Sequence, residues 1–213
     1  DVVVVGAPAD APNLGDTGSS AVEPPYVVSV LEGIQGAVLD RAVVTPLPRP
    51  VFPDDDARLA AADLVVPAVG LQPDDEGESV LGPGDRGDLA LPRGEEALFA
   101  EVRARVPAGR LVVLLVGSGP LTTAATTEAD ALLWVGYPGM EGGGAVADVL
   151  FGDAPPSGRL PFVWPAAEAD LPPFDDVSLA VTYDRWHGHR YLHRALTAPR
   201  FPFGFGLATT ELR

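Results

Sequence analysis

An acidic, glycine-rich loop holds the side chains of this sequence that are best suited to chemistry. Its charged residues are, in order, Asp74, Asp75, Glu76, Glu78, Asp85 and Arg86. A carboxylic acid can donate a proton to a leaving oxygen only if it is still protonated near neutral pH. Neighbouring carboxylates and partial burial raise the pKa of such a group, and a nearby Arg limits the rise. The loop therefore predicts a general acid, with Glu76 as the proton donor.

Two other interpretations of the acidic loop compete with this one. Most acidic residues of a chain with 30 Asp and Glu must simply face water, so the loop could be a solvated turn. Carboxylates are also the ligands that Ca²⁺ prefers, but their spacing here does not follow the pattern of an EF-hand loop. We expect no bound metal ion and no cofactor.

The histidines are a second group of candidate ligands. On a strand, His187 and His189 would lie on one face, and with His193 beyond them they could begin a zinc site. The aromatic neighbours favour a structural role instead: Tyr183, Trp186 and Tyr191.

Two glycine-rich turns do not fit the motifs that they suggest. No Gly-x-Gly-x-x-Gly follows the apolar run that ends at Gly6, which argues against a dinucleotide site. Ser118 lies in a Gly-rich turn but lacks the Gly-x-Ser-x-Gly elbow of a serine hydrolase.

The composition excludes several classes of function. The formal net charge is −16 and the isoelectric point about 4.3, so we expect no nucleic acid and no anionic membrane as a partner. There is no Cys, which excludes disulfides and thiolate metal sites, and no apolar run approaches the roughly 18 residues of a membrane span. The first residues lack an initiator Met and a signal peptide's charged n-region. We interpret the chain as cut from a longer protein, with a cytoplasmic location favoured.

Apolar strands and helices alternate along the chain, as in a parallel sheet covered on both faces. The expected strands are 2–5, 42–44, 64–69, 111–116 and 132–135, with 160–164 as a further apolar segment. The expected helices are 28–38, with Ser29 as a possible N-cap, 54–62, 94–106 and 141–151, with a helical turn at 122–128. The fold class is thus α/β, in one domain over 1–213. Ligands bind beyond the carboxyl ends of such strands, so the acidic loop and the loops after Gly6, Gly117 and Gly136 should share one edge.

Six segments, in order, resemble one known family over nearly the whole chain. They are NLGDTGSSAVEPPYVVSVLEGI, DDEGES with GDRGDLALP, DALLWVGYPGMEGGGAVADVLFGDAPPSGRLPF, ADLPPFDD, VTYDRWHGHRYL and FPFGFGL. The run YPGMEGG…ADVLFGD…PSGRLP is the most specific of them. The family is the glycoside hydrolase family 3 β-glucosidases, and the resemblance is to their second domain, an α/β sandwich.

The resemblance implies a three-layer sandwich, with a mostly parallel sheet of about six strands between helices. It also implies a retaining exo-β-glycosidase that hydrolyses terminal β-linked sugars of a glycoside or oligosaccharide. In the family this domain carries the general acid/base on a loop after a strand. The matching position is Glu76, which precedes the Gly of a Glu-Gly step, with Glu78 as its rival and Asp85 and Arg86 as loop support.

The resemblance has limits that shape the hypothesis. The family's nucleophile is an Asp on a preceding (β/α)₈ barrel, so Glu76 makes half a site and a barrel in cis or trans is the implied partner. Ala21 stands where relatives often have Arg, which would weaken a contact to the acidic loop or the barrel. The exposed apolar side of such a domain would include Trp134, Tyr137 and Met140. The alternative is a stand-alone, non-catalytic carbohydrate-binding or assembly module.

Overall fold

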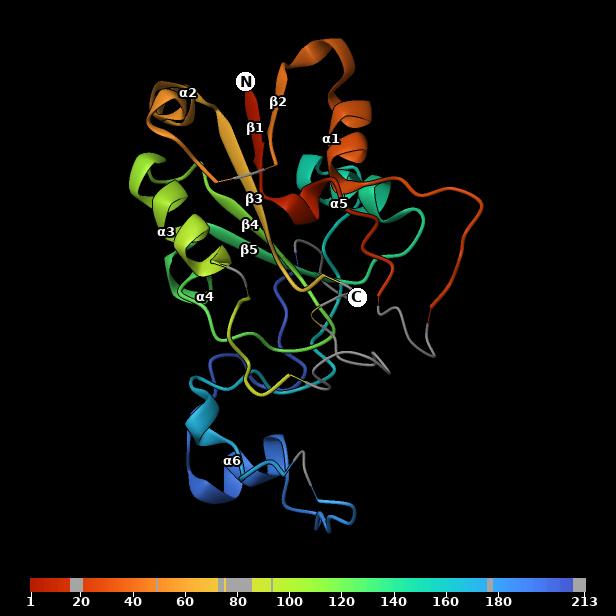
Figure 1. Ribbon diagram of the computed structural model, residues 1–213, viewed down its shortest axis with the longest axis vertical. Coiled ribbons are helices and arrows are strands. Elements are labelled where there is room, and N and C mark those ends of the chain that lie inside the picture. The colour runs from red at the N-terminus through yellow and green to blue at the C-terminus, as the bar shows by residue number, and fades with distance from the viewer. Residues whose placement is uncertain are drawn as a thin grey trace.

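A parallel sheet of five strands lies at the centre of the computed structural model, which describes residues 1–15, 21–48, 50–72, 75, 86–92, 94–175 and 178–208 (Figure 1). The strands are β1 (Val2–Val5), β2 (Val44–Leu47), β3 (Leu64–Gly70), β4 (Val112–Val116) and β5 (Ala131–Gly136). Their order across the sheet is β2-β1-β3-β4-β5, and every neighbouring pair is parallel. The described residues thus supply five of the about six strands that the resemblance implied.

Helices cover both faces of this sheet. The α-helices of the described residues are α1 (Val30–Val38), α2 (Asp56–Ala61), α3 (Glu95–Arg105), α4 (Ala125–Glu128), α5 (Gly142–Phe151) and α6 (His189–Ala195). Short 3₁₀ turns are η1 (Ala7–Ala9), η2 (Leu39–Arg41), η3 (Pro53–Asp55) and η5 (Glu168–Asp170). In Figure 1, α1 and α5 lie on one side of the sheet and α2 and α3 on the other, while α6 lies apart at the lower end. The predicted three-layer α/β sandwich is confirmed, and no helix among the described residues is long and apolar enough to span a membrane.

The uniformly apolar strands are explained by burial on both faces. Val2 and Val4 pack in the core cluster that includes Ile34 of α1 and Val146 of α5. Val3 and Val5 point the other way, into the cluster around Phe99 and Val102 of α3. Because successive side chains of a strand alternate between faces, a strand covered on both sides needs apolar residues at every position.

The start of α1 follows the capping pattern expected from the sequence. The Ser29 hydroxyl accepts a hydrogen bond from the Glu32 N–H at 3.2 Å, and the Ser29 N–H donates to the Glu32 carboxylate at 2.9 Å. This reciprocal capping box satisfies two N–H groups that a helix start leaves without partners. The predicted cap is confirmed, and the helix begins at Val30, two residues after the predicted 28.

The position of β2 was predicted wrongly. The sequence suggested 42–44, whereas the strand runs Val44–Leu47 and includes Pro46. Proline has no N–H to donate to a sheet, so it argues against a central strand. At the edge of the sheet β2 pairs only with β1, with Val4 opposite Pro46, and an edge strand tolerates the missing donor.

Residues 160–164 form no strand of the sheet and instead pair with the aromatic tail. Leu160 N–H donates to Phe205 O at 2.8 Å, and Trp164 and Phe201 exchange two backbone bonds at 2.8 and 3.3 Å. A row of aromatic rings runs from β5 to the tail, and each ring packs against the next edge-on, tilted or stacked, with centroids 4.9–5.9 Å apart. The rings are, in order, Trp134, Phe162, Trp164, Phe201 and Phe205. Because this pairing brings residues 164 and 201 together, the intervening residues 165–200 form a long excursion from the core, that is, a connection that contains η5 and α6.

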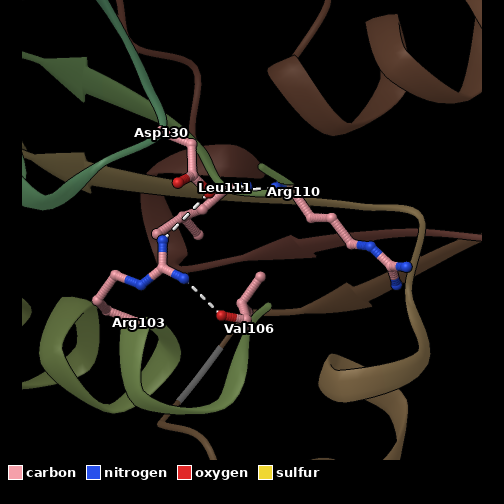
Figure 2. A network of polar contacts seen from close by, with 5 residues as sticks. All are labelled: Arg103, Val106, Arg110, Leu111 and Asp130. Atoms are coloured by element: carbon pink, nitrogen blue, oxygen red, sulfur yellow. Dashed lines mark hydrogen bonds and ion pairs between the residues drawn. The ribbon is translucent and has the colours of Figure 1, made fainter. Parts of the chain in front are cut away.

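Asp130 ties the amino ends of β4 and β5 to α3 (Figure 2). Its Oδ2 accepts the N–H groups of Arg110 at 3.1 Å and Leu111 at 3.0 Å, and pairs with the Arg103 guanidinium at 3.1 Å. Arg103 also donates to the Val106 carbonyl at the end of α3. The network therefore lies at the edge of the sheet opposite to the strand carboxyl ends.

Candidate active site at the carboxyl edge of the sheet

The carboxyl ends of the parallel strands lie at one edge of the sheet, and a glycine stands where the chain leaves each of four strands. Gly6, Gly70, Gly117 and Gly136 end or follow β1, β3, β4 and β5, and all have positive φ. A Cβ at Gly70 would lie 1.9 Å from Val116 O, and one at Gly6 would lie 2.2 Å from Ala68 O. Only glycine fits where the backbone turns out of the sheet so close to its neighbours. The predicted gathering of these loops at one edge is confirmed.

The acidic loop leaves this edge at a favourable place. β2 lies on one side of β1 and β3 on the other, so the connections after β1 and β3 diverge. In open parallel sheets this reversal of strand order creates a crevice in which ligands bind. The acidic loop follows β3 directly and therefore starts at the crevice.

A buried carboxylate holds the strand end from which the acidic loop starts. Glu95, in the first turn of α3, is 8% exposed and accepts the Gly70 N–H through Oε2 at 2.7 Å. Leu71 N–H extends the ladder to Val116 O at 2.9 Å. Sequence reasoning missed Glu95 because an acidic residue in the first turn of a helix is common for dipole reasons alone.

Asp75 has a structural partner at the start of the loop. Its Oδ2 accepts the Gln72 N–H at 2.9 Å, and its own N–H donates to Gln72 O at 2.8 Å. These two bonds close a tight turn of the kind that Asp side chains favour. Asp75 therefore helps to shape the loop.

The other predicted loop carboxylates, Asp74, Glu76, Glu78 and Asp85, lie outside the described residues. Arg86 is described and partly buried, and its Nη1 is buried without a hydrogen-bond partner in that part of the structure. A buried guanidinium nitrogen without an acceptor costs free energy. Nη1 of Arg86 is thus a buried donor, next to the acidic loop in sequence, that has no acceptor among the described residues.

The chain that returns from the loop is tied to two other segments. Ala90 and Thr122 form a parallel bridge, with Thr122 N–H donating to Leu89 O at 2.7 Å. Leu89 N–H donates to the Glu168 carboxylate of η5 at 3.0 Å. Both ends of the acidic loop are thus anchored by backbone hydrogen bonds.

The approach to α1 is joined to the start of α5 at the same edge. Val28 N–H donates to Met140 O at 2.8 Å, and the Tyr26 hydroxyl donates to the Glu141 carboxylate. The hydrogen bond to Glu141, with its charge, raises the pKa of Tyr26. Ala21, where a family Arg was expected, is exposed.

The histidines do not lie on a strand, so the arrangement considered for the less favoured zinc alternative is not present. Gly188 caps α6, His187 precedes the helix, and His189 is its first residue. His187 Nδ1 lies 2.6 Å from Asp184 O, whereas His189 stacks on Phe203 with ring centroids 4.9 Å apart. Within the described ranges, no group of three or more His, Asp or Glu side chains could hold a metal ion.

The apolar residues proposed for an exposed side are partly buried. Trp134 and Tyr137 pack against the main core, and Trp134 Nε1 donates to Gly117 O at 3.1 Å. Met140 is also half-buried. The large apolar side chains that are exposed lie elsewhere, and include Val22, Tyr26, Phe174, Leu179, Val181, Tyr183, Phe203 and Leu207.

A parallel sheet between two layers of helices, with a reversal of strand order, defines an α/β sandwich domain of a kind found in many enzymes. The chain matches the glycosyl hydrolase family 3 C-terminal domain over residues 1–209, and it belongs to that family.

Similar proteins include glycosidases of fungi and bacteria. "Probable beta-glucosidase E" of Aspergillus oryzae is 33% identical over 219 positions, which cover 91% of this chain and 20% of that protein. "Xylan 1,4-beta-xylosidase" of Xylanibacter ruminicola is 34% identical over 162 positions, covering 72% of this chain and 17% of that protein. The solved glycoside hydrolase family 3 β-glucosidase of Neurospora crassa superposes with a TM-score of 0.81 at 26% identity, over 99% of this chain and 28% of that one. The chain thus spans about a fifth of the length of its curated relatives.

Proposed function

We propose that this chain supplies the general acid/base of a retaining exo-β-glycosidase. The observation that carries the proposal is the origin of the acidic loop at the carboxyl end of β3, beside the reversal of strand order, in a member of a glycosyl hydrolase family. Glu76 is the proposed acid/base, and Glu78 is its rival. Asp85 and Arg86 are proposed to support the loop.

The surroundings of the loop suit a carboxyl group that must change protonation. Several carboxylates crowd the loop, and their mutual repulsion favours keeping one of them protonated near neutral pH. The Arg86 Nη1 is buried and has no acceptor among the described residues, so it is available to orient one carboxylate of the loop. The anchors at Gly70 and Leu89 limit how far the loop ends can move.

The proposed reaction needs a second carboxylate, supplied by a (β/α)₈ barrel domain in cis or in trans. In the first step, Glu76 donates its proton to the glycosidic oxygen while the barrel carboxylate bonds to the anomeric carbon and the leaving group departs. In the second step, the Glu76 carboxylate removes a proton from water, whose oxygen attacks the anomeric carbon and frees the nucleophile. This chemistry requires the two carboxyl groups to lie about 5–5.5 Å apart.

The proposed substrates are glycosides or oligosaccharides with a terminal β-linked sugar. Relatives carry the names β-glucosidase and β-xylosidase, so glucose and xylose are the sugars to test. No cofactor, metal ion, nucleic acid or membrane takes part in the proposed reaction.

The test is Glu76→Gln in the complete enzyme, assayed with two β-glucosides of different leaving group. Gln cannot donate a carboxylic proton, so glycosyl transfer from methyl β-glucoside should slow by about 10²–10⁴-fold. Transfer from a dinitrophenyl β-glucoside should slow far less in single-turnover kinetics, because that leaving group needs no proton. The exposed Glu101→Gln on α3 serves as the control and should preserve both rates.

The same assay decides between the two glutamates. If Glu78→Gln slows transfer from methyl β-glucoside much more than from the dinitrophenyl β-glucoside, and Glu76→Gln does not, the acid/base is Glu78. Equal slowing of both substrates in both variants would contradict a general-acid role for the loop.

A further inference from the structure

A cavity of about 570 Å³ lies in the 165–200 excursion, away from the sheet. Its walls come from the Pro172-Pro173 turn, from residues 181–187 and from α6. The side chains that matter here are Tyr183, Asp184, Trp186, His187, Tyr191 and Arg194, and we name this cavity the α6 cleft. Its volume lies within the range of about 300–1,000 Å³ typical of small-molecule sites.

The aromatic wall of the α6 cleft is held in a fixed orientation. The guanidinium carbons of Arg185 and Arg194 each lie 4.8 Å from the centroid of the Trp186 ring. Such cation–π contacts restrain both partners and occupy a face of the indole. Tyr183, another lining residue, is 52% exposed although it is a large aromatic side chain.

The polar groups of the cleft include one acid and one guanidinium. Asp184 Oδ1 accepts the backbone N–H of Trp186 at 2.6 Å, which holds the carboxylate in place. Its second oxygen is a further acceptor. Arg194 also lines the cleft, and its guanidinium carries several N–H donors. The His187 ring is fixed by the contact of its Nδ1 with Asp184 O at 2.6 Å.

We propose that the α6 cleft binds a neutral pyranoside, as a mono- or disaccharide unit, without catalysing its hydrolysis. A pyranose ring has an apolar C–H face, which packs on an aromatic ring, and a rim of hydroxyls, each both donor and acceptor. The Asp184 carboxylate and the Arg194 guanidinium both line the cleft and can accept from and donate to sugar hydroxyls, whereas the carboxylate would repel a phosphate. A flat apolar ligand would leave both charges desolvated and unpaired.

The cleft is connected to the edge that carries the acidic loop. Pro172 and Pro173 follow η5, whose Glu168 carboxylate accepts the Leu89 N–H at 3.0 Å. A saccharide in the cleft would therefore be held on the same polypeptide as the proposed acid/base, by residues that take no part in its chemistry. The proposal does not depend on Glu76, because sugar binding in the cleft needs no proton transfer.

The test is a titration of the 213-residue chain with cellobiose, xylobiose and sorbitol, followed by calorimetry and by tryptophan fluorescence. The two β-linked disaccharides should bind saturably, and sorbitol should not, because it has the hydroxyls but lacks a rigid ring face. Of the three tryptophans, Trp186 lines the cleft, while Trp164 is only 2% exposed, so the fluorescence change should come from Trp186.

Variants locate the binding. Tyr183→Ala removes an exposed ring and should weaken binding about tenfold, the loss expected for one aromatic contact of about 1.4 kcal/mol. Trp186→Phe keeps a ring, so it should retain calorimetric binding and lose the fluorescence change. The matched control is Tyr26→Ala, since Tyr26 is 51% exposed but lies outside the cleft, and Glu76→Gln should also bind unchanged.

Three results would overturn the proposal. They are the absence of saturable binding by either disaccharide, equal binding of sorbitol, and binding that survives Tyr183→Ala but is lost in Glu76→Gln. The last result would place the sugar at the acidic loop. It would support the proposed acid/base site and exclude the α6 cleft as the sugar-binding site.

Discussion

Several of the described acidic residues near the carboxyl edge of the sheet accept hydrogen bonds from backbone N–H groups. Asp75, Glu95, Glu96 and Glu168 each accept a backbone N–H at 2.7–3.0 Å, from Gln72, Gly70, Ala124 and Leu89. These four described carboxylates are therefore acceptors that hold backbone segments in place.

At the opposite edge, the Asp130 network predicts a pH-dependent part of the stability. Backbone donors in the turn at Gly109 and Leu111, Gly109 first, and the Arg103 guanidinium lower the pKa of Asp130 from its usual 3.8. A lowered folded-state pKa contributes stability that is fully present above the unfolded value and is lost as the pH falls through the folded value. Asp130→Asn should thus cost about 1–2 kcal/mol of unfolding free energy at pH 7, and less near pH 3.

Urea unfolding at both pH values measures this difference. The Asp130 side chain is 26% exposed, so solvent reduces the effect without removing it. The exposed Asp153→Asn is the matched control and should change the unfolding free energy at neither pH. An Asp130→Asn loss of the same size at pH 3 and pH 7 would contradict the assignment.

At the scale of elements, the contact between α1 and α5 depends on two glycines. A Cβ at Gly33 would lie 2.0 Å from Gly143 O, and a Cβ at Gly143 would lie 1.9 Å from Ser29 O. Gly143 N–H also donates to Val28 O at 3.0 Å. The glycine run of the YPGMEGGG segment therefore permits close approach of two helices, and its role here is packing.

Substitution of adjacent glycines in α5 tests this role. Gly143→Ala places a methyl group against a backbone carbonyl and should destabilise the fold by about 1–3 kcal/mol. A methyl group at Gly144 would have no atom within 4 Å, so Gly144→Ala should stabilise the helix by about 0.5–1 kcal/mol. Thermal unfolding of both variants gives the comparison, and a loss of equal size in the two would show that the helix contact is not the cause.

At the scale of the whole molecule, the proposed reaction needs two carboxylates, of which this chain is proposed to supply one. The retaining mechanism requires a second carboxyl group about 5–5.5 Å from the first. We therefore expect the 213-residue chain alone not to hydrolyse p-nitrophenyl β-glucoside, and addition of the matching barrel domain to restore turnover. A barrel whose nucleophilic Asp is replaced by Asn is the control and should restore none. Turnover by the chain alone would contradict the two-domain site.

Local sequence patterns predicted most of the elements near their observed bounds. Val2–Val5 is β1 as expected, Ser29 caps α1, and Gly152 ends α5 in a left-handed conformation. These features depend on a few adjacent residues, and so they can be read from the chain. Pro46 in β2 was misjudged because only the sheet order shows that β2 is an edge strand.

The sequence by itself determined the α/β class, the order of strands and helices, and the family, because apolar periodicity and an ordered run of motifs are local properties. The tertiary structure decided what depends on residues far apart: that Glu95 holds Gly70, that Gly143 meets Ser29, and that Trp134 lies against Phe162. It also decided that the Trp186 segment closes against α6 to form a cleft. Such contacts join residues that are far apart in the sequence, so the spacing of residues along the chain does not predict them.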